Sequence, residues 1–86
     1  MEQNQIETIY KLIAKNLRVD ISKVTPEATF EKDLKADSLD IVELFIDIED
    51  AFGLSINIEE LQGTIVNVQD VVNAIDKLIA EKWTRL

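Results

Sequence analysis

Apolar residues recur at steps of three and four along three stretches of this chain, and this spacing constrains the fold more than any other feature. The stretches cover residues 3–17, 38–52 and 68–82. Such a period places the apolar side chains on one face of a helix, whereas no stretch shows the strict alternation of a strand. We therefore predict an all-α fold, a four-helix bundle of three long helices and one short helix with a long first loop.

Residues that favour helix ends support these limits. Asp37 or Ser38 can cap the second helix, because a short side chain with an oxygen accepts hydrogen bonds from the unpaired N–H groups of the first turn. Gly53 can end this helix, since glycine adopts the left-handed conformation without a steric penalty. Asn67 and Asp70 are spaced as a capping box at the start of the last helix. Both helices therefore begin at signals that are local in the sequence.

The segments between the helices are irregular. Residues 18–36 lose the helical period and form the long first loop, with a short turn expected after Asp20. We expect buried apolar residues to hold this loop, namely Val19, Ile21, Val24, Phe30 and Leu34. Farther along, Ser55 or Asn57 can open the short third helix, which Gly63 would end.

The composition limits the chemistry available to the chain. Its 86 residues suffice for one domain, residues 1–86, with a single small core. The chain contains no cysteine and no histidine, which excludes disulfides, the usual zinc sites, thiol nucleophiles and histidine general bases. The first residues do not resemble a secretory signal, and no apolar stretch approaches membrane-spanning length. We expect a soluble, cytoplasmic monomer that is not an enzyme and binds no metal.

Charge is distributed unevenly along the chain. The net charge is −8 and the isoelectric point is about 4.3, so the protein should repel the phosphates of nucleic acids. All nine basic residues lie before Ala36 or after Asp76, and every charge between these two positions is negative. An acidic surface can simply keep a small domain soluble. The uninterrupted acidic middle instead favours a surface that binds basic proteins, and we expect no nucleic acid as a partner.

The second helix has more than one distinctive face. At about 100° per residue, its core arc contains Ile41, Leu44, Phe45, Ile48, Ala51 and Phe52. A second arc contains Asp40, Glu43, Asp47 and Asp50. Like charges at these steps repel by a few tenths of a kcal/mol per pair, so a purely structural helix gains nothing from them. A third arc contains Leu39, Val42 and Ile46. It predicts a docking patch with an acidic rim; the alternative is that Leu39 or Val42 is buried in the core.

Ser38 lies where the long loop becomes this helix. A serine at a helix start is by default a cap. It cannot act as a nucleophile of the usual kind, because the chain has no histidine to accept its proton and no Gly-x-Ser-x-Gly elbow surrounds it. An exposed hydroxyl beside the N–H groups of a helix start can instead carry a phosphodiester that another enzyme attaches.

The segment around Ser38 resembles a known family. Residues 34–44 read Leu-Lys-Ala-Asp-Ser-Leu-Asp-Ile-Val-Glu-Leu. This is similar to the attachment site of discrete acyl carrier proteins of fatty acid synthesis, where Leu-Gly-Ala-Asp-Ser-Leu-Asp is common, and the resemblance extends from the first helix to about Ile79. It implies a phosphopantetheine group on Ser38, attached by a phosphopantetheinyl transferase that brings coenzyme A. It also implies partner contacts at Asp37, Leu39, Asp40, Val42, Glu43, Ile46, Glu49 and Asp50.

The resemblance further implies a cargo. Acyl groups would be held as thioesters on the terminal thiol of the phosphopantetheine arm and delivered to enzymes with basic patches. Because a medium or long acyl chain is apolar, we expect the helices to sequester it from water. The expected acyl pocket consists of Ile41, Leu44, Phe45, Ile48, Val71, Val72 and Ile75.

The chain departs from the family pattern at three places. Lys35 stands where glycine is usual, and residues 57–66 lack the usual opening with proline and acidic residues. Residues 83–86 are either an extension of family length or a second packing element. Two alternatives remain open at this point. The chain could be a polyketide, aminoacyl or lipid-modification carrier, or it could be an unmodified acidic adaptor domain.

Overall fold

The structure is a computed structural model that describes residues 1–84 of the chain, and it contains each helix expected from the sequence. The element order is α1 (Gln3–Leu17), the 3₁₀ turn η1 (Ile21–Lys23), α2 (Ser38–Phe52), α3 (Ile58–Gln62) and α4 (Val68–Thr84). Within these residues the only β-type pairing is an isolated bridge between Thr29 and Asn67. The prediction of an all-α fold with three long helices and one short helix is confirmed.

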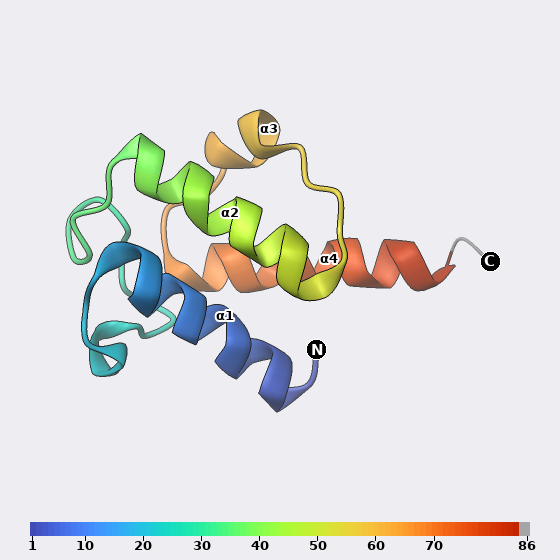
Figure 1. Cartoon of the computed structure of the whole chain (residues 1–86), viewed down its shortest axis with the longest axis horizontal. Helices are drawn as coiled ribbons and strands as arrows, with labels where there is room; N and C mark the ends of the chain where they lie inside the picture. Colours follow the sequence, from blue (N-terminus) through green and yellow to red (C-terminus); the bar gives the residue numbers. More distant parts are fainter. Residues whose placement is uncertain (85–86) are drawn as a thin grey trace.

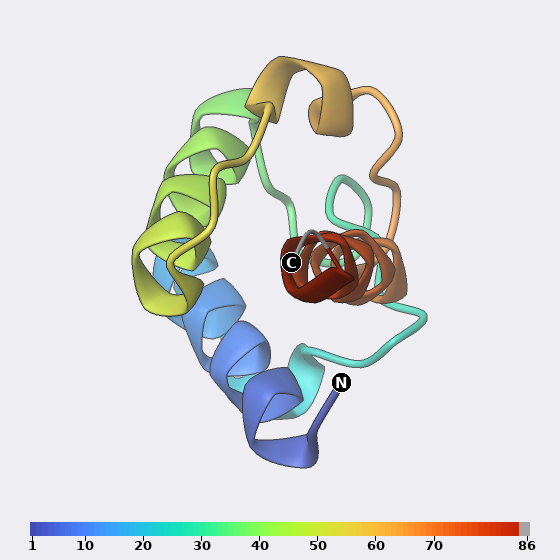
Figure 2. The same cartoon turned by 90° about the vertical axis from the view of Figure 1, so that its right-hand side faces the viewer.

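The helix α4 runs along the longest dimension of the molecule, and the other elements surround it (Figure 1). Helices α1 and α2 lie side by side and antiparallel. In the view along α4 they form a wall on one side, with α3 above and the first loop on the opposite side (Figure 2). The start of α2 therefore lies at the same end of the molecule as the first loop and the start of α4.

The core lies where the apolar faces of α1, α2 and α4 meet. Its fully buried side chains are Ile9, Ile13, Leu44, Phe45, Ile48, Val68, Val71 and Ile75. Each large side chain of this kind contributes about 1.5–3 kcal/mol by leaving water. Ala51, which we expected on the core arc, is exposed. It lies at the edge of that arc beside the acidic residues and in the last turn of α2, so its small side chain stays in contact with solvent.

The first loop is tied to the segment that precedes α4. The backbone N–H of Phe30 donates to the carbonyl of Val66 at 3.0 Å, and the N–H of Val68 donates to the carbonyl of Ala28 at 3.0 Å. These bonds satisfy backbone groups that would otherwise be unpaired beneath the surface. The expectation that this long loop is held down is therefore correct, and its partner is a segment about 40 residues farther along the chain.

Buried side chains anchor the same loop. Val24, Phe30 and Leu34 are buried as expected, and Val19 is partly buried. Ile21 is 48% exposed, so its expected burial is wrong. Asp20 caps the turn η1 by accepting a hydrogen bond from the Ser22 N–H at 2.9 Å, and this turn directs Ile21 outward. The same backbone N–H lowers the pKa of the Asp20 carboxyl below its ordinary value.

The helix ends follow their local signals. Gly53 ends α2 in the left-handed conformation with a φ of 62°. Asn57, and not the serine before it, caps α3, because its Oδ1 accepts a hydrogen bond from the N–H of Glu60 at 3.2 Å. At the start of α4, Asn67 and Asp70 form the reciprocal pair that their spacing predicts.

The C-terminal helix continues slightly farther than expected, to Thr84. The question whether residues 83–86 form a second packing element lies outside the described side chains, which end at Lys82. Over residues 1–84, none of the helices combines the length and the apolar character needed to cross a membrane.

Candidate functional site

Asp37 makes the cap at the start of α2. Its Oδ1 accepts a hydrogen bond from the N–H of Asp40 at 2.9 Å, and the Asp40 Oδ2 accepts one from the N–H of Asp37 at 3.2 Å. The two residues thus form a capping box. Ser38 is the first residue inside the helix. The choice that the sequence left open is therefore decided: the cap belongs to Asp37 and not to Ser38.

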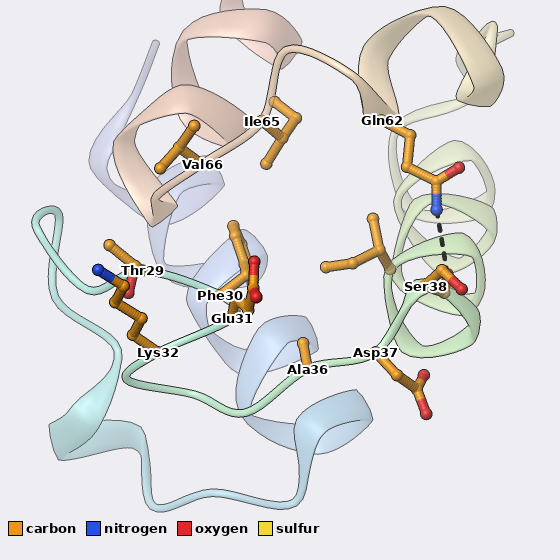
Figure 3. A pocket seen from close by; sticks show the side chains of 11 residues that line it. Thr29, Phe30, Glu31, Lys32, Ala36, Asp37, Ser38, Gln62, Ile65 and Val66 are labelled. Carbon is orange, nitrogen blue, oxygen red and sulfur yellow. Dashed lines mark hydrogen bonds between the residues drawn. The ribbon is translucent and has the colours of Figure 1, made fainter.

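The hydroxyl of Ser38 is free for other chemistry. The residue is exposed, and within residues 1–84 no hydrogen bond involves its Oγ. Its backbone carbonyl accepts a hydrogen bond from the Nε2 of Gln62 at 3.2 Å, which joins the end of α3 to the start of α2 (Figure 3). The backbone around Ser38 is therefore held, while its side chain faces solvent.

The segment that leads into Ser38 is fixed on both sides of Lys35. The N–H of Ala36 donates to the carbonyl of Phe30 at 2.7 Å, and the side chain of Leu34 is buried. Lys35 itself has a φ of 54°, in the left-handed region that favours glycine. Lys35 therefore replaces the family's usual glycine at a position where glycine would adopt the backbone conformation without strain.

A cleft with a volume of about 540 Å³ opens beside Ser38, between the first loop and residues 62–66. Its lining residues are the apolar Phe30, Ala36, Ile41, Ile65 and Val66 and the polar Thr29, Glu31, Lys32, Asp37, Ser38 and Gln62. Figure 3 shows Ser38 and Gln62 at one end of the cleft and Thr29 and Lys32 at the other. An elongated ligand attached to Ser38 has apolar surface within reach along this cleft.

The residues expected to form the acyl pocket lie mostly in the closed core. Leu44, Phe45, Ile48, Val71, Val72 and Ile75 are all buried. Ile41 is only partly buried, and it is the one member of this set that lines the cleft. The structure therefore joins the core to the cleft at Ile41, whereas the other six side chains are buried within the core cluster.

The surface of α2 carries the apolar arc expected from the sequence. Leu39 is 63% exposed and Ile46 is 45% exposed, whereas Val42 is half-buried. The alternative that Leu39 belongs to the core is therefore wrong. Glu43 and Asp50 are exposed on the same helix. The structure leaves this combination of aliphatic and acidic side chains accessible to another protein.

Besides Asp40 in the capping box, two further acidic residues of α2 have partners within the described chain. The Nδ2 of Asn16 donates to the Oδ2 of Asp47 at 2.9 Å, which ties α1 to α2. The N–H of Ile56 donates to the Oε2 of Glu49 at 2.7 Å, which holds the segment after α2. Glu49 was expected only as a partner contact, and this structural contact was not predicted from the sequence.

Most of the residues that line the cleft were likewise not predicted from the sequence. Gln62, Ile65 and Val66 have no periodic spacing that relates them to Ser38. Their position depends on the hydrogen bonds that bring the first loop against the segment before α4. The sequence of residues 57–66 departs from the family pattern, which indicated an unusual segment. This departure did not show that the segment lies against the first loop.

Comparison with known proteins identifies the class of this site. The family model described as a phosphopantetheine attachment site matches residues 7–75. An acyl carrier protein of Rubrobacter xylanophilus is 52% identical over 54 residues, which cover 62% of this chain and 67% of that protein. An acyl carrier protein of Helicobacter pylori strain G27 is 57% identical over 47 residues, which cover 55% of this chain and 60% of that protein. The chain belongs to the phosphopantetheine-attachment family of acyl carrier proteins.

The residues present fit the cofactor of this family, which is phosphopantetheine. Ser38 offers an exposed hydroxyl without a hydrogen-bond partner in the described chain, and the start of α2 carries the partial positive charge that suits a phosphate. The cleft beside it provides room for an attached group. Proteins of this family carry acyl groups and do not catalyse reactions, so the prediction that the chain is not an enzyme is confirmed.

Proposed function

We propose that Ser38 carries the phosphopantetheine group and that the protein delivers acyl groups to enzymes of fatty acid biosynthesis in the cytoplasm. The observation that carries this proposal is the free hydroxyl of Ser38 at the start of α2, where Asp37 makes the cap instead. When bound, the group supplies a thiol that holds acyl groups as thioesters. The chain therefore needs no cysteine of its own.

Attachment requires a second protein. No histidine is available to accept the proton of Ser38, and its nearest acidic neighbours, Asp37 and Asp40, hold each other's backbone N–H groups. A phosphopantetheinyl transferase would supply both coenzyme A and the base. Ser38 and the first turn of α2 contribute an accessible acceptor whose backbone is already ordered.

The exposed side of α2 is the proposed docking surface for the transferase and for acyl-processing enzymes with basic patches. Leu39, Val42 and Ile46 provide apolar contacts, and the acidic rim consists of Asp37, Asp40, Glu43 and Asp50. Charged rims mainly raise association rates and select partners, which suits a carrier that visits many enzymes briefly. Glu49 can contribute only through the oxygen that does not hold Ile56.

The acidic α2 and the Asp-Ser-Leu-Asp motif support fatty acid biosynthesis over a polyketide, aminoacyl or lipid-modification pathway. A direct comparison of cargo tests this choice. The loaded protein is offered to acyl-transfer enzymes of fatty acid synthesis and, separately, to an aminoacyl-adenylating ligase. We expect acyl loading to be faster, and faster aminoacyl loading would contradict the pathway.

The proposed path of a long acyl chain begins at the cleft and passes Ile41 toward Leu44, Phe45 and Ile48. Burying the chain there is favourable by about 25 cal/mol per Å² of apolar surface, although the packed core must open to admit it. Unfolding temperatures should therefore rise with acyl length and then level off. No dependence on length would argue for short or polar cargo.

Peptide mapping can locate the attachment point. Trypsin cleaves after Lys35 and next after Lys77, so the group should appear on the peptide that covers residues 36–77. Fragmentation must then distinguish Ser38 from Ser55 and Thr64 in the same peptide. The proposal predicts modification of Ser38 alone. Modification of Ser55 or Thr64 would overturn it.

A further inference from the structure

We propose that Lys35 pairs with the phosphate of the phosphopantetheine group on Ser38 and thereby limits the directions in which the arm leaves the protein. This inference rests on the proposed attachment at Ser38. It gives Lys35 a positioning role toward the cofactor and no part in the chemistry of the acyl group.

The backbone of Lys35 is held in a conformation that a lysine rarely adopts. Its φ is 54°, whereas glycine would take this conformation without a steric penalty. The N–H of Leu34 donates to the carbonyl of Thr29 at 3.0 Å, and the N–H of Ala36 donates to the carbonyl of Phe30 at 2.7 Å. These bonds fix both neighbours, so the strain at Lys35 cannot relax. A lysine that adopts such a strained conformation points to a use for its side chain.

The ammonium group of Lys35 has no ion-pair partner within the described residues. The residue is exposed, and no carboxylate of residues 1–84 lies within 4 Å of its nitrogen. The two acidic residues closest in sequence are engaged elsewhere. The Oδ2 of Asp33 accepts hydrogen bonds from the N–H and hydroxyl of Thr29, at 2.8 and 3.2 Å, and the Oδ1 of Asp37 holds the N–H of Asp40. The cation therefore remains available.

A phosphate on Ser38 would otherwise lie in acidic surroundings. Asp37 precedes the serine and Asp40 lies in the same first turn of α2. Beyond Ser38, the next basic residue along the chain is Lys77. The partial positive charge of the helix start offsets only part of the repulsion between carboxylates and phosphate. Lys35 supplies the nearest full positive charge in the sequence.

The distance between the two positions suits such a pair. Three residues span at most about 11 Å, a gap that the flexible four-carbon stem of lysine and the serine ester cover together. Lys32 is the next cation before Lys35, but Figure 3 shows it at the end of the cleft opposite Ser38. Lys32 therefore provides a control that removes the same charge from the same loop.

The test compares the form without the group and the loaded form of four proteins at low ionic strength. These are the wild type, Lys35→Asn, which tolerates the left-handed conformation, Lys35→Arg, which keeps the charge, and Lys32→Gln. Thermal unfolding of both forms gives the change in Tm on loading. We expect loading to lower Tm by about 1–4 °C more in Lys35→Asn than in the other three proteins. This excess should disappear in 1 M salt.

A second readout uses the wild type alone. Nuclear magnetic resonance of the lysine side chains should show a shift of the Lys35 ammonium signal on loading, while the signal of Lys23, which is exposed and does not line the cleft, stays unchanged. A structural role for Lys35 that is independent of the cofactor would not move this signal. The measurement also decides the question if the transferase fails to load Lys35→Asn.

The outcomes separate the inference from the proposed function. If the wild type gains no group at Ser38, the proposed function fails. If the wild type is loaded but its Lys35 signal does not change, the pairing is overturned while the attachment at Ser38 stands. An equal change in Tm for Lys35→Asn and Lys32→Gln would likewise overturn the pairing. A larger loss in Lys35→Asn that Lys35→Arg restores supports it.

Discussion

The two ends of α2 are stabilised in different ways. At the C-terminal end, the Nζ of Lys82 reaches from α4 to the carbonyl of Gly53 at 2.8 Å, across 29 positions of sequence. The carboxylate of Glu49 holds the N–H of Ile56 at 2.7 Å. At the N-terminal end, the cap is made between Asp37 and its close neighbour in the first turn. At the C-terminal end a charged side chain from a distant helix binds the terminal carbonyl, whereas at the N-terminal end the first N–H groups are capped by neighbouring residues and the distant Gln62 binds only a backbone carbonyl.

The two ends of α2 therefore differ in what they leave accessible to other molecules. The contact with α4 holds the C-terminal end of α2 in place. The local cap at the N-terminal end satisfies the backbone and leaves the hydroxyl of Ser38 exposed beside the cleft. Gln62 is the residue that crosses to this end, and it binds the carbonyl of Ser38 and not the hydroxyl. Substitutions at the two ends should therefore have distinct consequences, and the following four are ordered by their expected effect on stability.

Gly53→Ala should have the largest effect, because an alanine at a φ of 62° is strained. We expect a loss of about 1–2 kcal/mol in the free energy of unfolding, measured with urea. The added Cβ would lie 3.6 Å from the Nζ of Lys82, an ordinary contact, so the backbone causes the loss. The control is Gly63→Ala, where φ is −74° and alanine should be neutral or stabilising. Equal losses at both glycines would show that the left-handed conformation of Gly53 is not what limits this substitution.

Asp37→Ala should destabilise the open end by about 1 kcal/mol, because the N–H of Asp40 loses its acceptor. Asp37→Asn should retain most of the stability, since an amide oxygen also caps. Ser38→Ala should cost less than about 0.5 kcal/mol, because its hydroxyl takes no part in the cap. Chemical unfolding of the three variants checks the order. A larger loss for Ser38→Ala than for Asp37→Ala would show that the serine is the cap.

Lys82→Met should remove the hydrogen bond to Gly53 and a favourable charge at the C-terminal end of α2. We expect a loss of about 0.5–1 kcal/mol that decreases at high salt. Lys77→Met removes the same charge from the same helix, and no residue of the described chain forms an ion pair with Lys77. Thermal unfolding of both variants at low and high salt separates the contact from the charge. If they behave alike, α4 does not fix this end.

Reversal of charge at Glu43 and Asp50 should change stability by only a few tenths of a kcal/mol, because both residues are exposed. The double variant to lysine should instead slow association with partner enzymes and flatten its salt dependence. Stopped-flow measurements check this. A double reversal at the exposed Glu7 and Glu27 alters net charge equally and should have a much smaller effect. Similar rates for the two double variants would mean that α2 has no special role in docking.

The sequence predicted the parts of the fold that depend on local signals. Helical periods placed the long helices, and Asn67 with Asp70 marked the start of α4. The predicted burial of Ile21 and Ala51 was wrong, because burial depends on elements that are distant in the sequence. Apolar character and an approximate arc do not say which side of a turn or which edge of a helix a neighbouring element covers.

The site was predictable only in part. The motif around Ser38 identified the residue, but two adjacent side chains with oxygen atoms left the cap undecided until the geometry assigned it to Asp37. The cleft was not predictable, because Phe30 and Val66 meet through a backbone hydrogen bond that no side-chain pattern encodes. The second role of Glu49, which holds Ile56, depends in the same way on tertiary contact.

We propose that the cap at Asp37 leaves the hydroxyl of Ser38 free to carry the cofactor. The most direct test is the intact mass of the wild type and of Ser38→Ala after incubation with coenzyme A and a phosphopantetheinyl transferase. We predict that the wild type gains the mass of one phosphopantetheine group and that the variant, which keeps the Asp37 cap and stays folded, gains none. A gain of mass by Ser38→Ala, or no gain by the wild type, would contradict the claim.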